Sequence, residues 1–410
     1  MSYNKKKLKD CCYVITDGDH LPPPKAQNGI PFITISNINE LNQISFDDIM
    51  YVPDEYYNAL SENKKAKRGD ILYSVVGSFG KPVYISEDKK FVFQRHIAIL
   101  KPNPEINSKF LYYIMLNPSF YNMVEKLAIG CSQKTVTLDT LRNIEIELPP
   151  LEKQIDIISV LSKIDNKISV NNKINDNLQQ QAKLLYDYWF TQFDFPDENG
   201  KPYRSAGGKM VWNEIMKRYI PSGWRVVPFL EVANWESNSQ PPKSEFIYEP
   251  KDGYIRFIQN RDYDSDTHKT YIPFAKNLSI VNRYDILMDK YGDAGAVRYG
   301  IEGAFNVALG KINVNDINHR EYIRSFLESD GIYNFLHNSC MASTRASLNE
   351  SNLAMLNIAI PDKQVVSEYE RLLHKIRDSI LKNKDESTKL VQLRNWLLPM
   401  LMNGQATISE

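Results

Sequence analysis

The chain has 410 residues, of which 42% are hydrophobic and 24% charged, with 50 Lys and Arg balancing 50 Asp and Glu. This length exceeds one ordinary hydrophobic core, so it predicts two or more domains, and the composition excludes a disordered chain. No apolar run approaches the ~20 residues of a membrane span, and the basic start MSYNKKKLKDCC has no apolar segment behind it, which argues against a secretory signal. A formal charge of zero counts mildly against a nucleic-acid binder, but it allows one basic face that is balanced elsewhere.

The two halves of the chain carry the same ordered set of short motifs, which indicates an internal duplication. In the first half an apolar run of β-type residues ends at Asn37 and is followed by RGDILYSVVGSFG at Arg68–Gly80. In the second half the corresponding run ends at Asn260 and is followed by RYDILMDKYGDAG at Arg283–Gly295. Both copies predict a strand that runs into a tight turn, where glycine permits positive φ or a close approach of the backbone to a ligand. Purely structural turn glycines are the alternative.

Each half then continues with a helical stretch, an alternating strand and a long helix. Tyr121-Asn122 recurs as Tyr333-Asn334, and FLYYIMLNPSFYNMVEKL in the first half predicts an amphipathic helix or a helix pair. The segments LRNIEIELPPLEKQ (Leu141–Gln154) and LAMLNIAIPDKQ (Leu353–Gln364) match each other. In each of them proline stops an alternating strand, and a long helix follows.

The two long helices each carry a seam of residues spaced alternately by four and three, which is the heptad pattern of a coiled coil. The seam residues are Ile157, Leu161, Ile164, Ile168, Asn171, Leu178 and Leu185 in the first helix, and Leu373, Ile376, Ile380, Asn383, Leu390 and Leu397 in the second. Full antiparallel overlap would place Ile157 opposite Leu397, and Asn171 opposite Asn383, where paired amides fix the register. Two unrelated amphipathic helices on separate cores are the alternative.

The predicted fold is α+β, with two similar globular domains, each a small β-sheet plus helices. Two long antiparallel helices join these domains as a coiled coil, which makes the molecule pseudo-two-fold symmetric. We expect the first globular domain at 1–150, the first long helix at 151–195, a linker and the second globular domain at 196–360, and the second long helix with a tail at 361–410. The linker Phe193–Trp224 is rich in Gly, Pro and polar residues, as is typical of an ordered surface crossing.

This organisation resembles the specificity (S) subunit of type I restriction-modification systems. The RxDIL…GxxG pair, the two helix entries and FDFPDENGKPYRSAGGKMVWNE…IPSGW carry the resemblance, which covers nearly the whole chain. It implies that each globular domain is a target recognition domain reading one half of a split DNA sequence, and that the helices set the spacer and dock two modification (methyltransferase) subunits.

The resemblance also implies what the partners supply. They would include restriction (nuclease/translocase) subunits, and they would carry out adenine-N6 methylation and ATP-dependent DNA cleavage with S-adenosylmethionine, ATP and Mg. This chain would be a non-catalytic, cytoplasmic protein with no cofactor and no membrane contact.

The sequence itself offers little catalytic chemistry. Asn117-Pro118-Ser119-Phe120 comes near the Asn-Pro-Pro-Tyr/Phe signature of amino-methyltransferases, but the second proline is missing and no glycine-rich cofactor loop accompanies it. The six histidines form no pair at metal-ligand or nucleophile-base spacing, and the four cysteines (Cys11, Cys12, Cys131 and Cys340) read as reduced thiols rather than metal ligands. Two alternatives remain: a catalytic DNA methyltransferase, and a non-catalytic coiled-coil scaffold with two peptide-binding modules.

We expect the DNA contacts in three loops of each half, because Lys and Arg bind phosphates, and Arg, Lys, Asn, Gln, Ser and Thr read base edges. The first loop follows the early strand and comprises Ser36 and Asn37 in one half, and Gln259, Asn260 and Arg261 in the other. The second is the glycine turn, with Ser78, Phe79 and Lys81, and with Lys290, Tyr291 and Arg298. The third precedes the exit strand, with Ser132, Gln133, Lys134 and Thr135, and with Ser343, Thr344 and Arg345. For any one of these residues, an ordinary polar position on the surface is the alternative.

Overall fold

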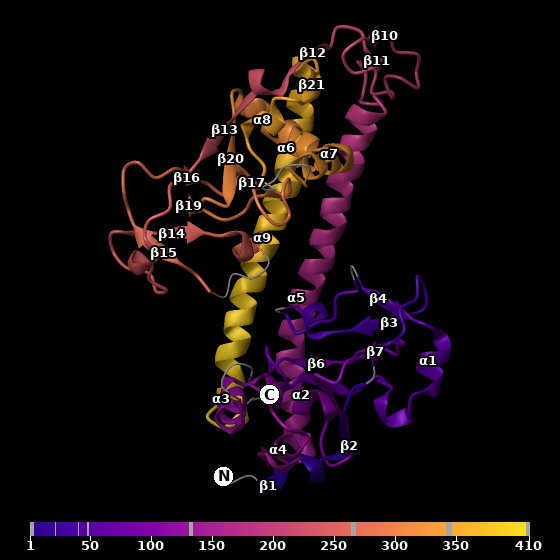
Figure 1. Ribbon diagram of the computed structural model, residues 1–410, viewed down its shortest axis with the longest axis vertical. Helices are drawn as coiled ribbons and strands as arrows, with labels where there is room; N and C mark the ends of the chain where they lie inside the picture. The colour runs from indigo at the N-terminus through magenta and orange to yellow at the C-terminus, as the bar shows by residue number, and fades with distance from the viewer. Residues whose placement is uncertain are drawn as a thin grey trace. The chain divides into compact units, whose positions relative to one another are not determined.

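The structure, a computed structural model, describes residues 4–20, 22–39, 41–46, 49–130, 134–263, 268–341 and 347–406, without the side chain of residue 341. It divides into two compact units, which are Met1–Val170 with Glu386–Glu410 (unit 1) and Asn171–Asp385 (unit 2). Two long helices, α5 (Leu151–Tyr186) and α9 (Lys363–Met402), each contribute one end to each unit (Figure 1).

Unit 1 is built around an antiparallel four-stranded sheet with strand order β2-β8-β5-β6. A three-stranded sheet, β4-β3-β7, and a two-stranded sheet, β1-β9, complete it. The strands are β1 (Asn4–Lys7), β2 (Cys12–Asp17), β3 (Ile30–Ile33), β4 (Met50–Val52), β5 (Ile71–Ser74), β6 (Pro82–Tyr84), β7 (Val92–Phe93), β8 (Ile97–Pro102) and β9 (Glu145–Leu148). The helices are α1 (Asp54–Ala59), α2 (Ser108–Leu116), α3 (Pro118–Leu127) and α4 (Leu138–Asn143).

Both faces of the central sheet of unit 1 are covered, which explains why the first three residues of β5, Ile71–Tyr73, are apolar without alternation. Ile71 and Tyr73 pack in the same buried cluster as Phe110 of α2, while Leu72 belongs to a second cluster with Ile33 of β3. Successive side chains of a strand point to opposite faces, so a strand covered on both faces is apolar at successive positions rather than at alternate ones.

Unit 2 repeats this plan with sheets β13-β20-β17-β18, β15-β14-β19-β16 and β12-β21, and adds the hairpin β10-β11. Its strands are β10 (Met210–Asn213), β11 (Arg218–Pro221), β12 (Arg225–Pro228), β13 (Ala233–Ser237), β14 (Tyr254–Ile258), β15 (Tyr271–Pro273), β16 (Ile280–Val281), β17 (Ile286–Asp289), β18 (Val297–Arg298), β19 (Gly303–Phe305), β20 (Leu309–Val314) and β21 (Asn357–Ile360). Its helices are α6 (Arg320–Glu328), α7 (Asp330–Met341) and α8 (Glu350–Leu353).

The strand pairings confirm that the motif duplication reflects a duplicated topology. Parallel pairing joins β3 to β7 in unit 1 and β14 to β19 in unit 2, and every pair in the two central sheets is antiparallel. The predicted combination of small sheets and helices is therefore confirmed. The stretch around Asn117 is a helix pair, α2 and α3, and the two predicted exit strands are β9 and β21.

Within each unit the ends of α5 and α9 contact each other. In unit 1 Leu161 shares a buried cluster with Leu401, and the Asp165 carboxylate accepts from Arg394 at 2.9 Å. In unit 2 the Asn383 side-chain amide donates to the Asn175 carbonyl oxygen at 2.9 Å. The expected partner of Asn383 was Asn171, one helical turn away, so the expected register is corrected by one turn. All residues of the predicted seams are buried or half-buried.

Two further expectations concern single residues and the membrane. The thiols of Cys11, Cys12 and Cys340 are free and buried, and Cys131 lies outside the described residues. Over the described ranges, no helix combines the length and apolar character needed to cross a membrane.

Candidate nucleic-acid interface

The aspartate of the repeated RxDIL motif fastens the start of the strand to its neighbour in both units. In unit 1 the Asp70 carboxylate accepts from the backbone N–H of Lys67 at 2.8 Å and pairs with Lys101 of β8 at 2.6 Å. In unit 2 Asp285 accepts from a backbone N–H in the same way and lies 3.6 Å from Lys311 of β20. The motif therefore aligns β5 and β17 so that the glycines follow at a fixed place.

The first glycine turn, residues 74–81, is closed by its own backbone and by Ser74. The Gly80 N–H donates to the Ser74 carbonyl at 2.9 Å, and the Lys81 N–H donates to the Ser74 hydroxyl oxygen at 2.9 Å. Gly77 and Gly80 have φ of 70° and 91°, which is the left-handed region that glycine adopts without strain. The turn leaves Ser78 exposed and Lys81 half-buried.

Phe79 does not offer its ring to a ligand. The ring is buried and stacks on Tyr121 of α3 with centroids 5.5 Å apart. The DNA contact of Phe79 stays a prediction, and the observed packing counts against it because the ring lies against α3. Phe79 supports the turn from below.

The second and third loops of unit 1 lie together. The Gly77 N–H donates to the carbonyl of Lys134 at 3.0 Å, and Thr135 pairs with Val76 in an isolated β-bridge. The Lys134 side chain is exposed and binds Glu125 at 2.8 Å, an ion pair that raises the pKa of the ammonium. Ser132 and Gln133 lie outside the described residues.

The first loop of unit 1 is held by local capping. Asn37 ends a 3-10 turn, Ile35–Asn37, and its side-chain oxygen accepts from the Thr34 N–H at 2.9 Å. Ser36 is exposed, and its hydroxyl lies 2.7 Å from that of Thr34. Asn37 is therefore engaged in its own turn, whereas Ser36 faces solvent.

In unit 2 the first loop and the segment just beyond the third loop both lie close to the second glycine turn, residues 289–296. The carbonyl of Ala308 accepts from the Lys290 N–H at 2.9 Å and from the Asn260 side chain at 3.5 Å. The Leu348 N–H, just beyond the third loop, donates to the Lys290 carbonyl at 3.0 Å. Ser343, Thr344 and Arg345 themselves lie outside the described residues.

Arg298 is committed to holding this turn. Its guanidinium donates to the Asp289 carboxylate at 2.7 Å, and Asp289 is 1% exposed. A buried carboxylate needs a paired cation, so contact between Arg298 and a phosphate would cost that pairing. The DNA contact of Arg298 stays a prediction, and its pairing with Asp289, which sequence position alone did not show, counts against it.

The remaining predicted residues of unit 2 differ in their exposure. The side chain of Arg261 is 58% exposed, and Tyr291 is 49% exposed. Lys290 is half-buried near the Trp235 ring, and burial lowers the pKa of its ammonium. The Gln259 side chain donates to the Thr270 hydroxyl at 2.9 Å. Arg261 and Tyr291 are therefore the best placed of these residues to meet a macromolecule.

The methyltransferase-like Asn117-Pro118 sequence has a structural explanation. Asn117 is buried between α2 and α3, and its side-chain oxygen accepts from the Ser119 N–H at 2.9 Å as the N-cap of α3. Proline is favoured at the first position of a helix, where its missing N–H is not needed. Within the described ranges, no group of His, Cys, Asp and Glu side chains is arranged to hold a metal ion.

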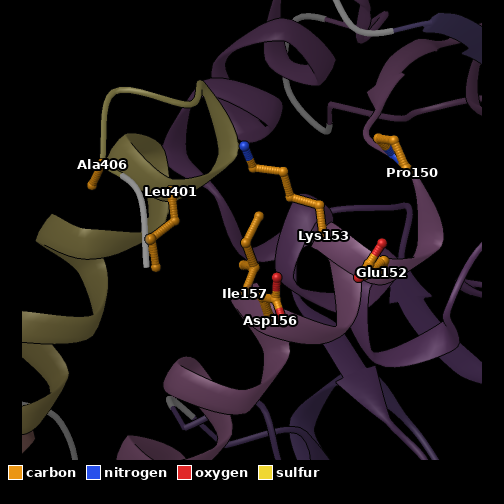
Figure 2. Close-up of a pocket in the computed structure, with 7 residues that line it drawn as sticks. All are labelled: Pro150, Glu152, Lys153, Asp156, Ile157, Leu401 and Ala406. Carbon is orange, nitrogen blue, oxygen red and sulfur yellow. The ribbon is translucent and has the colours of Figure 1, made fainter. Parts of the chain in front are cut away.

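A hollow of about 310 Å³ lies in unit 1 at the start of α5 (Figure 2). Figure 2 shows the Lys153 side chain extending away from the carboxylates of Glu152 and Asp156, so these charges do not converge on one point. The described residues that line the hollow include no predicted DNA-binding residue and no histidine, cysteine or serine.

Comparison with known proteins identifies the family to which the chain is similar. A model described as type I restriction modification DNA specificity domain matches residues 2–180 and 221–390. The type I restriction enzyme MjaIX specificity subunit of Methanocaldococcus jannaschii is 24% identical over an alignment of 327 residues, which covers 75% of this chain and 71% of that protein. The type I restriction enzyme HindI specificity subunit of Haemophilus influenzae is 22% identical over an alignment of 406 residues, which covers 83% of this chain and 87% of that protein.

A solved structure shares the fold. The S subunit of the type I restriction-modification system from M. genitalium superposes with a TM-score of 0.54 at 15% sequence identity, covering 99% of this chain and 97% of that one. Because the family model matches most of the chain in two separate segments, the chain belongs to the family of type I restriction-modification DNA specificity domains and carries that domain twice.

Proposed function

We propose that this chain is the DNA sequence-recognition subunit of a type I restriction-modification complex, and that each unit reads one half of a split target. One observation carries the proposal: the same backbone frame presents the glycine turn in both units. The Val136 N–H donates to the Val75 carbonyl at 2.8 Å, and the Leu348 N–H donates to the Lys290 carbonyl at 3.0 Å. A frame that is kept while its loop residues differ is what two readers of different half-sequences require.

The long helices set the spacer between the half-sequences in this proposal. The antiparallel contacts within each unit support one antiparallel coiled coil with pseudo-two-fold symmetry, formed by α5 and α9. Helix α5 has 36 residues, about 54 Å at ~1.5 Å per residue, and successive major grooves on one DNA face are ~34 Å apart. The outer faces of the helices dock two modification subunits.

The chemistry resides in the partners. The modification subunits transfer the methyl group of S-adenosylmethionine to adenine, and restriction subunits cleave DNA with ATP and Mg. The chain itself is a non-catalytic, cytoplasmic protein. The structural role of Asn117 as the N-cap of α3 supports this division.

The experiment compares the purified chain with the chain bound to its modification subunits. We expect methylation only in the complex, and DNA affinity that falls steeply with salt because phosphate contacts release counterions. Methylation by the chain alone would overturn the proposal in favour of a methyltransferase. Affinity for peptides with no salt-dependent binding of DNA would favour a scaffold.

A charge-matched pair of variants locates the interface. Arg261→Ala should weaken binding and reduce the salt slope by about one unit, because Arg261 is exposed in a predicted contact loop. Lys276→Ala removes the same charge from an exposed position of unit 2 outside the three loops and should leave the slope unchanged. Equal effects of the two variants would show that these loops do not form the interface.

A further inference from the structure

Two tyrosines occupy the same place under the two glycine turns. Tyr121 is the fourth residue of α3, and Tyr333 is the fourth residue of α7. In unit 1 the order along the chain is β8, α2 and α3, and in unit 2 it is β20, α6 and α7. The duplicated topology therefore brings each tyrosine to the glycine turn of its own unit. The chemistry by which each ring holds its turn is different.

In unit 1 the contact is apolar. The Tyr121 ring lies parallel to the Phe79 ring, with an interplanar angle of 5°. A Cβ atom on Gly80 would come within 2.5 Å of the Tyr121 ring, so backbone and ring are in close contact. Among the described residues the Tyr121 hydroxyl makes no hydrogen bond, so Tyr121 contacts the turn through its ring.

In unit 2 the contact is polar. The Tyr333 hydroxyl donates to the Asp293 carboxylate at 2.5 Å, and the other Asp293 oxygen lies 3.6 Å from Arg298. Arg298 in turn binds the buried Asp289 at the base of the turn. The Tyr333 hydroxyl thus extends a series of polar contacts that runs from Asp293 through Arg298 to Asp289.

Both turns need such support because of their glycines. Gly77, Gly80, Gly292 and Gly295 all have φ between 70° and 101°. Glycine populates many backbone conformations, so a turn containing two of them is not held in one shape by its own dihedral preferences. A contact from outside the turn adds to the hydrogen bonds that close it and stabilises the shape that presents Ser78 in unit 1 and Tyr291 in unit 2.

We propose that Tyr121 and Tyr333 are positioning residues that hold the glycine turns in the conformation that reads DNA. The inference rests on the proposed function and names the groups that act on its loops without touching DNA. It implies that the same substitution has opposite outcomes in the two units. Tyr→Phe preserves a stacked ring but removes a hydroxyl hydrogen bond.

The test uses the full chain in complex with modification subunits and maps the methylated sequences in a random DNA library. Tyr121→Phe should leave both half-sequences unchanged, whereas Tyr121→Leu should lower discrimination about tenfold in one half only. Tyr333→Phe should lower discrimination about tenfold in the other half only, because a hydrogen bond to a charged group is lost. Asp293→Ala, at the exposed partner of the same bond, should reproduce the Tyr333→Phe result.

A matched control removes a similar bond elsewhere in unit 2. The Tyr284 hydroxyl donates to the Asp378 carboxylate at 3.0 Å, away from the glycine turn, so Tyr284→Phe should leave discrimination unchanged. If Tyr333→Phe and Asp293→Ala keep full discrimination, as the control Tyr284→Phe should, or if they lower discrimination equally in both halves, the inference is overturned. A wild-type complex that methylates without sequence preference would instead overturn the proposed function, and the inference with it.

Discussion

The Glu370 carboxyl of α9 should make the folded chain less stable as pH rises. It accepts a hydrogen bond from the backbone N–H of Tyr322 at 2.9 Å and lies near the fully buried Glu321. Burial, with a further contribution from the Glu321 charge, raises the pKa of Glu370 from 4.5 to about 8. In the unfolded chain the same group ionises near 4.5.

The direction in which stability changes with pH follows from proton binding in the folded and unfolded states. Between pH 4.5 and about 8 the folded state keeps the proton on Glu370 and the unfolded state has lost it, so stability falls as pH rises through this window. Each unit of pKa difference corresponds to ~1.4 kcal/mol. With allowance for partial exposure of Glu370, the free energy of unfolding should fall by about 3 kcal/mol across this window. Glu370→Gln keeps an acceptor for Tyr322 and removes the ionisation.

The assay is urea unfolding of wild type and variant at pH 5, 6.5 and 8. The variant should gain little at pH 5 and about 3 kcal/mol at pH 8. Glu368→Gln is the control, because the ion pair of exposed Glu368 with Arg371 lowers the pKa of that carboxyl. The control should therefore lose no more than about 0.5 kcal/mol at pH 8. A gain from Glu370→Gln that is equal at all three pH values would refute the ionisation argument.

Two further predictions concern packing. Asn175→Leu should lower the free energy of unfolding by about 2 kcal/mol, because it removes the acceptor of Asn383. The double variant Asn175→Leu/Asn383→Leu should recover most of that loss in urea unfolding, since neither amide of the pair is left without its partner. Simple additivity of the two single costs would contradict the observed register. Gly80→Ala should lower the free energy of unfolding by at least about 2 kcal/mol, because the new Cβ would lie 2.5 Å from the Tyr121 ring. Gly292→Ala has nothing within 4 Å of its Cβ and should cost about 1 kcal/mol from its positive φ alone. Equal costs would show that the Tyr121 ring moves aside.

The sequence predicted the features that depend on local pattern. The alternating exit strands, their terminating prolines and the strand entering each glycine turn all follow from spacing and turn residues, and the structure contains them as β9, β21, β5 and β17. Repetition strengthened each of these predictions, since a pattern found twice in the same order is unlikely to arise from composition.

The features that the sequence did not predict depend on contacts between distant segments. Heptad spacing defines a seam but leaves its register free by one turn, and only the structure joins Asn383 to Asn175. Likewise, residue type made Phe79 and Arg298 candidates for DNA contacts. Their actual partners, Tyr121 and Asp289, are set by helix packing and by sheet register.

The most direct measurement of the central claim is the methylated sequence produced after exchange of one unit. Residues 1–150 are replaced by the matching segment of a relative with a different target, and DNA modified by the chain with its modification subunits is sequenced for methylated adenine. The account predicts that one half of the split target changes to that of the relative, while the other half and the spacer stay the same. A change in both halves, or in neither, would contradict the claim that each unit reads its own half of the DNA.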